Sequence, residues 1–135
     1  MMKFDHLGVF VKSLDEGRTH FNKMFHIKTV SDELYDPLMK VSVQFLVDSS
    51  GIRYETVAPN GLGNPVDAVL RDSKNILNHV AYLTDDFENE LLRLRVAGCL
   101  PLGKPMPAVA FNGSRVVFLL TPLRLILELI ESIYE

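Results

Sequence analysis

Two short stretches of this chain have nearly the same pattern, and that repetition limits the folds it can adopt. FDHLGVFV at residues 4–11 and ILNHVAYL at residues 76–83 each contain a histidine followed by alternating small and large apolar residues. A polar break and a helix-like segment follow in both cases. His79 lies 73 positions (79 − 6) after His6. Self-similarity at one fixed offset predicts two copies of a single supersecondary unit.

The same offset relates two carboxylates and two apolar strands further along the copies. Glu128 lies 73 positions (128 − 55) after Glu55, and VVFL at residues 116–119 aligns with VQFL at residues 43–46. The superposition of the two copies needs no insertion. Two histidines and two carboxylates therefore occupy equivalent places in the two copies, and this pairing is the main indication of function.

The first copy is predicted to be a βαβββ unit. Alternating β-branched and aromatic residues predict the strands, and Ser13 with Glu16 forms a capping box that predicts a helix start. The sequence DSSG at residues 48–51 is typical of a turn, which makes the last two strands a hairpin. The expected elements are a strand at 4–11, a helix at 14–25, strands at 27–34, 41–47 and 52–58, and a loop at 35–40.

The second copy follows a linker with two glycines. Asp85 with Glu88 predicts a second capping box, Gly98 is expected to end that helix, and residues 101–114 are expected to form an irregular loop. Strands are expected at 76–83, 116–119 and 125–130. We predict module one at 4–58, a linker at 59–75 with a short helix at 66–71, and module two at 76–131.

Neither copy is large enough to close a hydrophobic core alone. The fold class that we predict is therefore α+β: two tandem βαβββ modules form one curved, mixed β-sheet cup with the helices on the outside, in a single domain of 135 residues.

The composition excludes several kinds of partner. The formal net charge is −3 and Lys and Arg do not cluster, so no nucleic-acid footprint is predicted. The apolar C-terminal run is interrupted by Thr121, Pro122 and Arg124, which makes it too short and too polar to span a bilayer. The single cysteine, Cys99, excludes an intrachain disulfide and fits a reducing compartment. We expect a soluble, cytoplasmic protein.

Each of the four repeated polar residues has an ordinary alternative to a functional role. A histidine early in a strand often makes a local hydrogen bond, and Glu55 could lie on a solvated strand face. Glu128 is flanked by apolar residues on both sides, and burying an unpartnered carboxylate costs several kcal/mol. Its partner could be Arg53 or Arg115, or a metal ion.

The joint pattern favours the metal. Alternation places His6 on the face of Gly8 and His79 on the face of Ala81, so a small residue lies beside each histidine. Two neutral imidazoles and two carboxylates suit a borderline divalent cation and leave positions open for water or a bidentate substrate. A closed structural zinc site would more often use cysteine.

The segments DHLGVFV, YETVAP, NHVAY and LELIE resemble the four ligand-bearing segments of the vicinal oxygen chelate (glyoxalase/bleomycin resistance/dioxygenase) superfamily. The resemblance covers essentially the whole chain, because both modules match. It implies that His6, Glu55, His79 and Glu128 bind a divalent metal ion (Zn, Ni, Co or Mn). It also implies a homodimer.

The finer resemblance is to methylmalonyl-CoA epimerase-like and glyoxalase I-like members, as VSVQFL before ETVAP and NPVDAVL before the second histidine strand illustrate. It implies a metal-dependent lyase or isomerase that promotes proton transfer next to a metal-bound carbonyl or thioester of a small-molecule substrate. Glyoxalase I (lactoylglutathione lyase-type) activity is an alternative, and a non-catalytic small-molecule binding or resistance protein of the same fold is another.

Two residues receive further roles in this hypothesis. No carboxylate beyond the four candidates is evident near Gln44, so Glu128 is expected to act as both ligand and catalytic base. Gln44 is expected to bind the substrate by hydrogen bonding, since its amide cannot take a proton.

Overall fold

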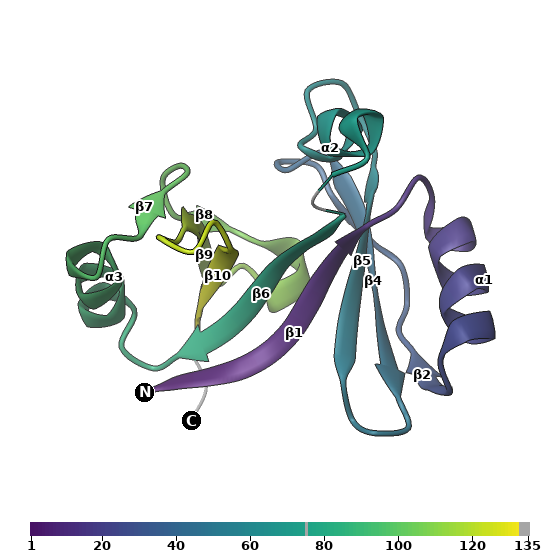
Figure 1. The fold of residues 1–135 in the computed structure, drawn as a ribbon, viewed down its shortest axis with the longest axis horizontal. Coiled ribbons are helices and arrows are strands. Elements are labelled where there is room, and N and C mark those ends of the chain that lie inside the picture. The colour runs from purple at the N-terminus through teal and green to yellow at the C-terminus, as the bar shows by residue number, and fades with distance from the viewer. Residues whose placement is uncertain (75, 133–135) are drawn as a thin grey trace. The chain divides into compact units, whose positions relative to one another are not determined.

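The computed structural model describes residues 1–74 and 76–132, and its chain divides into two compact units. The first unit is His6–Asn78, and the second joins Met1–Asp5 to the chain from His79 onward. Figure 1 shows the elements of both. Within the described residues, no helix is long and apolar enough to cross a membrane.

The first unit is built on a mixed sheet with the strand order β2-β4-β5-β1 (Figure 1). β4 and β5 form an antiparallel hairpin, β3 pairs with β4, and β5 runs parallel to β1. The helix α1 contacts β4 and β5. The elements are β1 (Met2–Phe10, which enters this unit at His6), α1 (Leu14–Met24), β2 (Ile27–Val30), β3 (Leu34–Asp36), β4 (Val41–Asp48), β5 (Arg53–Pro59) and α2 (Val66–Asp72).

The start of α1 confirms the predicted capping box. The Ser13 hydroxyl accepts a hydrogen bond from the backbone N–H of Glu16 at 3.1 Å, which satisfies one of the unpaired N–H groups of the first turn. Leu14, Gly17 and Phe21 form the buried side of the helix. A Cβ at Gly17 would lie 3.0 Å from a methyl carbon of Val11, so glycine permits the close approach of this helix.

The hairpin between β4 and β5 sets which side chains share a face. The Asp48 carboxylate accepts hydrogen bonds from the backbone N–H groups of Ser50 and Ile52, and Gly51 has a φ of +91° that favours glycine. The resulting register places Phe45 opposite Glu55 and Gln44 opposite Thr56. Because directly opposed residues point to the same side of a sheet, Phe45 and Glu55 share one face and Gln44 and Thr56 the other.

The second unit has the strand order β6-β10-β9-β7, with β8 paired to β9. β10 runs parallel to β6 and antiparallel to β9. Its elements are β6 (Leu77–Thr84, which enters this unit at His79), α3 (Phe87–Val96), β7 (Leu100–Pro101), β8 (Met106–Pro107), the 3₁₀ turn η1 (Val109–Phe111), β9 (Arg115–Leu120) and β10 (Ile126–Glu131).

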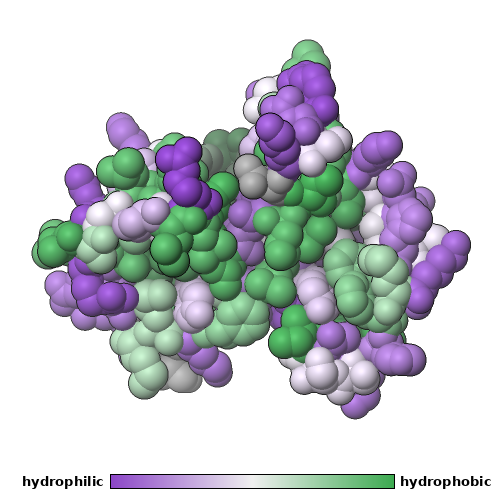
Figure 2. Space-filling model, viewed as in Figure 1, coloured by the Kyte–Doolittle hydropathy of each residue, from purple (hydrophilic) through white to green (hydrophobic). Residues whose placement is uncertain are grey.

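One face of this sheet packs on α3. The buried cluster comprises Phe87, Leu94, Cys99, Val117, Leu119, Leu127 and Leu129. Alternation therefore directs Phe118 and Glu128 to the other face. Apolar side chains also reach the surface of this unit, among them Leu100, Leu102 and Leu123, and Figure 2 shows hydrophobic surface over the region of β8 to β10.

Several element predictions were wrong in detail. Residues 35–36, expected in a loop, belong to β3, and the loop expected at 101–114 contains part of β7 together with β8 and η1. The N-cap of α3 is Asp86, whose side chain makes no capping hydrogen bond, so the capping box predicted at Asp85 and Glu88 is wrong. Asn75, the last residue of the predicted linker, lies outside the described residues.

Candidate metal centre

The first unit brings His6 and Glu55 together across two parallel strands. Gly8 in β1 is directly opposite Glu55 in β5, and His6 lies two residues earlier on the same face of β1. The His6 Nε2 and Glu55 Oε1 atoms are 3.3 Å apart. His6 is fully buried and Glu55 is 6% exposed. This unit therefore holds a nitrogen donor and an oxygen donor side by side, away from bulk solvent.

The second unit repeats this arrangement. Ala81 in β6 is directly opposite Glu128 in β10, and His79 lies two residues before Ala81. The His79 Nε2 and Glu128 Oε1 atoms are 3.2 Å apart, and both side chains are buried. The strand pairing, register and donor separation of the first pair are thus reproduced 73 positions later. The expectation that a small residue accompanies each histidine on its face is confirmed by the burial of Gly8 and Ala81.

An aromatic ring accompanies each pair, which the sequence reasoning missed. Phe45 packs edge-on against the His6 imidazole with ring centroids 5.6 Å apart, and Phe118 packs in the same way against His79 at 5.2 Å. Each phenylalanine is also directly opposite the glutamate of its pair. The signal was present in the sequence, because Phe45 and Phe118 are related by the same offset as the donors.

The donor separations fit metal ligation. Nitrogen and oxygen donors bind zinc and similar divalent ions at about 2.0–2.2 Å, so two neighbouring donors of one ion lie roughly 3.0–3.5 Å apart. Both His–Glu separations fall in this interval. Imidazole with carboxylate is also a donor set that Zn, Ni, Co and Mn accept. Each unit therefore presents two side chains that could hold such an ion.

The alternative partner Arg115 is engaged elsewhere. Its guanidinium donates hydrogen bonds to Glu131 at 2.8 and 3.0 Å and to Glu88 at 2.7 Å, and these bonds raise the pKa of Arg115. The same contact, chiefly through the hydrogen bonds from Arg115, lowers the pKa of Glu131. This ion pair stabilises the end of β10. It involves Glu131 and not the candidate ligand Glu128.

Gln44 lies on the opposite face of β4 from the His6–Glu55 pair. Its side-chain Nε2 donates to the Ser31 carbonyl at 2.9 Å, and its Oε1 accepts from Arg18 of α1 at 3.2 Å. Its register partner Thr56 also faces the helix, since Thr56 Cγ2 lies 3.4 Å from a Cβ built at Gly17. The structure does not bring Gln44 together with His6 and Glu55.

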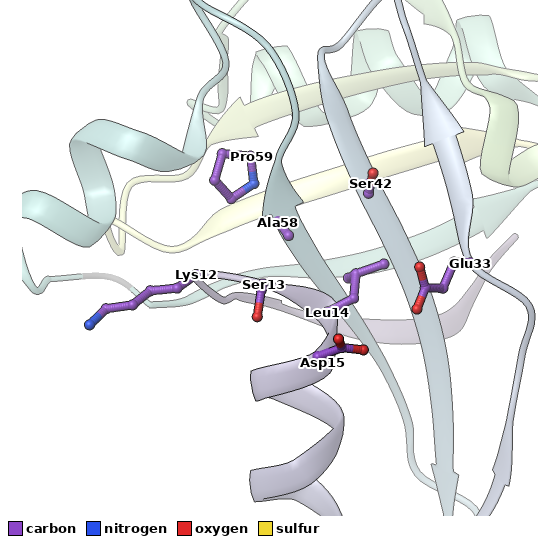
Figure 3. Close-up of a pocket in the computed structure, with 8 residues that line it drawn as sticks. All are labelled: Lys12, Ser13, Leu14, Asp15, Glu33, Ser42, Ala58 and Pro59. Atoms are coloured by element: carbon purple, nitrogen blue, oxygen red, sulfur yellow. The ribbon is translucent and has the colours of Figure 1, made fainter.

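A shallow hollow of about 230 Å³ lies on this same helix-facing side (Figure 3). It lies beside the start of α1, and its lining includes Ser13, Asp15, Glu33 and Ser42. Ser42 pairs with Ala58 and shares the face of Gln44, so the hollow is separated from the His6–Glu55 pair by the sheet itself. It is not part of the candidate metal centre.

Comparison with known proteins identifies the fold. No curated protein matches the sequence. A hypothetical protein from Bacillus halodurans C-125 superposes with a TM-score of 0.82 at 20% identity, covering 99% of this chain and 96% of that one. Methylmalonyl-CoA epimerase from Mycobacterium tuberculosis gives 0.78 at 19%, covering 97% and 88%. A single-residue variant of the Streptomyces coelicolor methylmalonyl-CoA epimerase, in complex with 2-nitronate-propionyl-CoA, gives a TM-score of 0.75 at 22% identity, covering 98% of both chains.

These similarities, each below 25% identity, confirm the predicted α+β class of the vicinal oxygen chelate fold. The sequence model of the glyoxalase/bleomycin resistance protein/dioxygenase superfamily matches residues 5–118, which is most of the chain and includes elements of both units. The chain therefore belongs to the glyoxalase/bleomycin resistance protein/dioxygenase superfamily.

Proposed function

We propose that this protein is a divalent-metal-dependent isomerase or lyase, in which His6, Glu55, His79 and Glu128 together bind one metal ion. The observation that carries the proposal is the repeated His–Glu pair. Each pair is buried, has the same strand register, and has donor atoms 3.2–3.3 Å apart. Structural roles alone do not require both units to keep the same two donors at the same two positions.

The four side chains have different roles in this proposal. His6 and His79 act as neutral nitrogen donors, and the two glutamates supply the negative charge that balances a divalent cation. A bound divalent ion supplies Lewis-acid chemistry, which stabilises negative charge on a carbonyl or thioester oxygen while the neighbouring C–H is deprotonated. Glu128 takes that proton from carbon and returns it. Glu128 is 4% exposed, and Phe118 lies directly opposite it on the same face of the sheet.

Methylmalonyl-CoA is the first substrate to test, because several of the similar structures are methylmalonyl-CoA epimerases, one of them in complex with methylmalonyl-CoA. Hemithioacetals of methylglyoxal are the second, since glyoxalase I activity needs the same proton transfer.

The family resemblance also favours a homodimer, which sedimentation analysis would test. Cys99 is a buried free thiol, which supports a reducing compartment such as the cytoplasm.

The test is metal content, measured by mass spectrometry on protein purified without added metal or chelator. Wild type is expected to hold one divalent ion per chain, and His6→Ala and Glu128→Ala are each expected to lose it. His20→Ala is the matched control, because His20 is an exposed residue of α1 and should leave the metal in place. A wild-type protein that holds no metal and takes none up on titration would contradict the proposed function.

Metal-loaded protein is then assayed for exchange of the substrate C–H proton with deuterium from the solvent, by NMR. Exchange at C2 of methylmalonyl-CoA supports the epimerase-like activity. Conversion of the methylglyoxal hemithioacetal, without exchange on methylmalonyl-CoA, supports the glyoxalase activity instead. A protein that holds metal but acts on neither would be better described as a binding protein of the same fold.

A further inference from the structure

Each histidine of the two candidate pairs packs against one phenylalanine ring that stands nearly perpendicular to it. The planes of His6 and Phe45 make an angle of 77°, and those of His79 and Phe118 an angle of 81°. An imidazole turns about its Cβ–Cγ bond, and this rotation has a broad, two-fold preference. An aromatic ring in contact at this angle limits the rotation, because a turning imidazole would collide with it.

The orientation of an imidazole decides whether it can bind a metal ion. A half-turn about the Cβ–Cγ bond exchanges the position of Nε2 with that of a ring carbon, which is no ligand. Metal ligands must be held within about 0.5 Å and 10–20° of the productive geometry by neighbours whose own positions are fixed. In both units Nε2 lies 3.2–3.3 Å from a glutamate oxygen, so the restrained orientation is the one that places the two donors side by side.

The two phenylalanines are themselves held by the backbone of their strands. The Phe45 N–H donates to the Ser31 hydroxyl at 2.9 Å, and the Phe45 carbonyl accepts from the Ser31 N–H at 2.8 Å. The Phe118 carbonyl accepts from the Leu102 N–H at 2.8 Å. These bonds point away from the strand that carries the glutamate. Each phenylalanine and its opposite glutamate therefore form a non-hydrogen-bonded pair, in which the side chains lie closer together.

The two phenylalanines differ in one neighbour. The Arg53 guanidinium carbon lies 3.9 Å from the centroid of the Phe45 ring, and the position that corresponds to Arg53 in the second copy is Ile126, an aliphatic residue. The cation–π contact is therefore not part of the repeat. What the two copies share is the perpendicular ring beside the histidine, together with the glutamate opposite that ring.

We infer that Phe45 and Phe118 are positioning residues that hold the imidazoles of His6 and His79 in the orientation that binds the metal ion. This inference rests on the proposed function and deepens it, since it assigns to each donor pair the neighbour that fixes its nitrogen. Replacing the neighbours that orient metal ligands lowers metal affinity by roughly 10- to 100-fold. If the rings only filled space, their replacement by another apolar side chain would lower stability without a specific effect on the metal.

The first experiment compares the zinc affinity of leucine variants. Metal-free protein is titrated with Zn²⁺ against a chromophoric chelator of known affinity, and urea unfolding of the same metal-free samples measures stability. Phe45→Leu and Phe118→Leu should each raise the zinc dissociation constant by roughly tenfold or more. Leucine keeps an apolar contact but cannot present a ring to the imidazole.

Two other phenylalanines are matched controls, because they pack on the helix-covered faces of the same sheets. Phe21 is 6% exposed, as is Phe45, and its ring centroid lies 5.0 Å from that of Tyr54, which alternation directs away from the face of Glu55. Phe87 belongs to the buried cluster of the second unit. Phe21→Leu and Phe87→Leu should lower stability but leave the zinc dissociation constant within roughly twofold of wild type.

The second experiment measures the mobility of the imidazoles and needs no metal. In metal-free protein, carbon-13 relaxation of the His6 ring should give a lower order parameter in Phe45→Leu, falling to roughly 0.6 or below, the range of flexible groups, while His79 keeps its wild-type value. Phe118→Leu should show the reverse. Phe45→Met replaces Phe45→Leu in both experiments if that variant fails to fold.

The inference is overturned if Phe45→Leu and Phe118→Leu change the zinc dissociation constant no more than the control variants do, or if both imidazoles keep their wild-type order parameters. A wild-type protein that takes up neither zinc nor another divalent ion contradicts the proposed function and the inference with it. Zinc binding that is indifferent to these two substitutions contradicts the inference alone.

Discussion

Glu128 is the residue that we propose to act as both metal ligand and base. It is 4% exposed, its neighbours Leu127 and Leu129 pack in the core beneath β10, and its carboxylate lies beside His79 on the other face. Glu55 has the same strand register but different neighbours, Tyr54 and Thr56. The roles of the two carboxylates can therefore be compared by making the same substitution at each position.

Glu128→Gln is expected to lower proton exchange on the substrate by at least roughly 100-fold while keeping most of the metal. The amide oxygen remains a donor, but the amide cannot accept the proton. Metal content and deuterium exchange measured on the same sample test both parts. Glu55→Gln serves as the control and should retain measurable exchange. Wild-type exchange in Glu128→Gln would show that Glu128 is not the base.

Glu131 gives a prediction for stability against pH. Hydrogen bonds from Arg115 hold the pKa of Glu131 below its ordinary value of 4.5, so the folded state favours the charged form. The stabilisation is therefore present above pH 4.5 and is lost as the pH falls through the lowered pKa. The difference in unfolding free energy between wild type and Glu131→Gln should be seen at pH 7 and shrink below pH 4.5. Urea titrations at both pH values measure it, and a difference independent of pH would contradict the assignment.

The candidate metal centre was predictable from the sequence only where its residues recur in both copies. His6, Glu55 and their counterparts were found because the offset is constant and because isolated polar residues stand out in apolar strands. Phe45 and Phe118 were missed because a phenylalanine in a strand is the ordinary expectation for a core. The choice of Gln44 was made without the register of the hairpin, and it is that register, set at the Asp48 turn, that puts Gln44 on the face of α1.

At the scale of elements, the two helices that cover the sheets begin in different ways. The first turn of α1 is capped by the Ser13 hydroxyl, whereas the N-cap of α3, Asp86, makes no capping hydrogen bond with its side chain. Asp86 instead accepts a hydrogen bond from the Asn89 side chain, and its own backbone N–H donates to the Thr84 hydroxyl. The sequence signal is similar at both sites, and only the structure distinguishes them.

Ser13→Ala is therefore expected to destabilise the protein by about 1 kcal/mol, since it leaves a helix N–H without its acceptor. Asp86→Ala is the matched comparison and should cost less than half as much, because no capping hydrogen bond is lost. Urea unfolding of both variants followed by circular dichroism measures the difference. Equal losses of unfolding free energy in the two variants would show that the capping hydrogen bond of Ser13 does not stabilise the protein.

The elements that were missed share a physical cause. β7 and β8 each span two residues, and β3 spans three immediately before Pro37. Strands this short carry too few residues for alternation to be visible, and they exist because β9 and β4 offer edges to pair with. Longer elements, such as β4 and α1, carry their own periodicity and were predicted to within one or two residues.

For the whole molecule, the proposed ion has donors in both compact units, so binding should couple them. We expect one ion per chain. At a metal concentration of 100 times the dissociation constant, the free energy of unfolding should rise by about 2.7 kcal/mol, which raises the thermal midpoint by roughly 10 °C. EDTA should remove this gain. His6→Ala and His79→Ala should each abolish it completely, which calorimetry with metal analysis will measure. Two ions per chain, with each variant keeping one, would show that the pairs bind separately.

The difference between Arg53 and Ile126 has a consequence for stereochemistry. Two identical donor pairs present a bound molecule with the same ligands from either copy, so they do not by themselves favour one orientation over its reverse. A residue that is charged in one copy and aliphatic in the other removes that equivalence. A substrate bound at the proposed ion would then distinguish the first copy from the second. The handedness of a reaction at that ion would follow from such departures from the repeat.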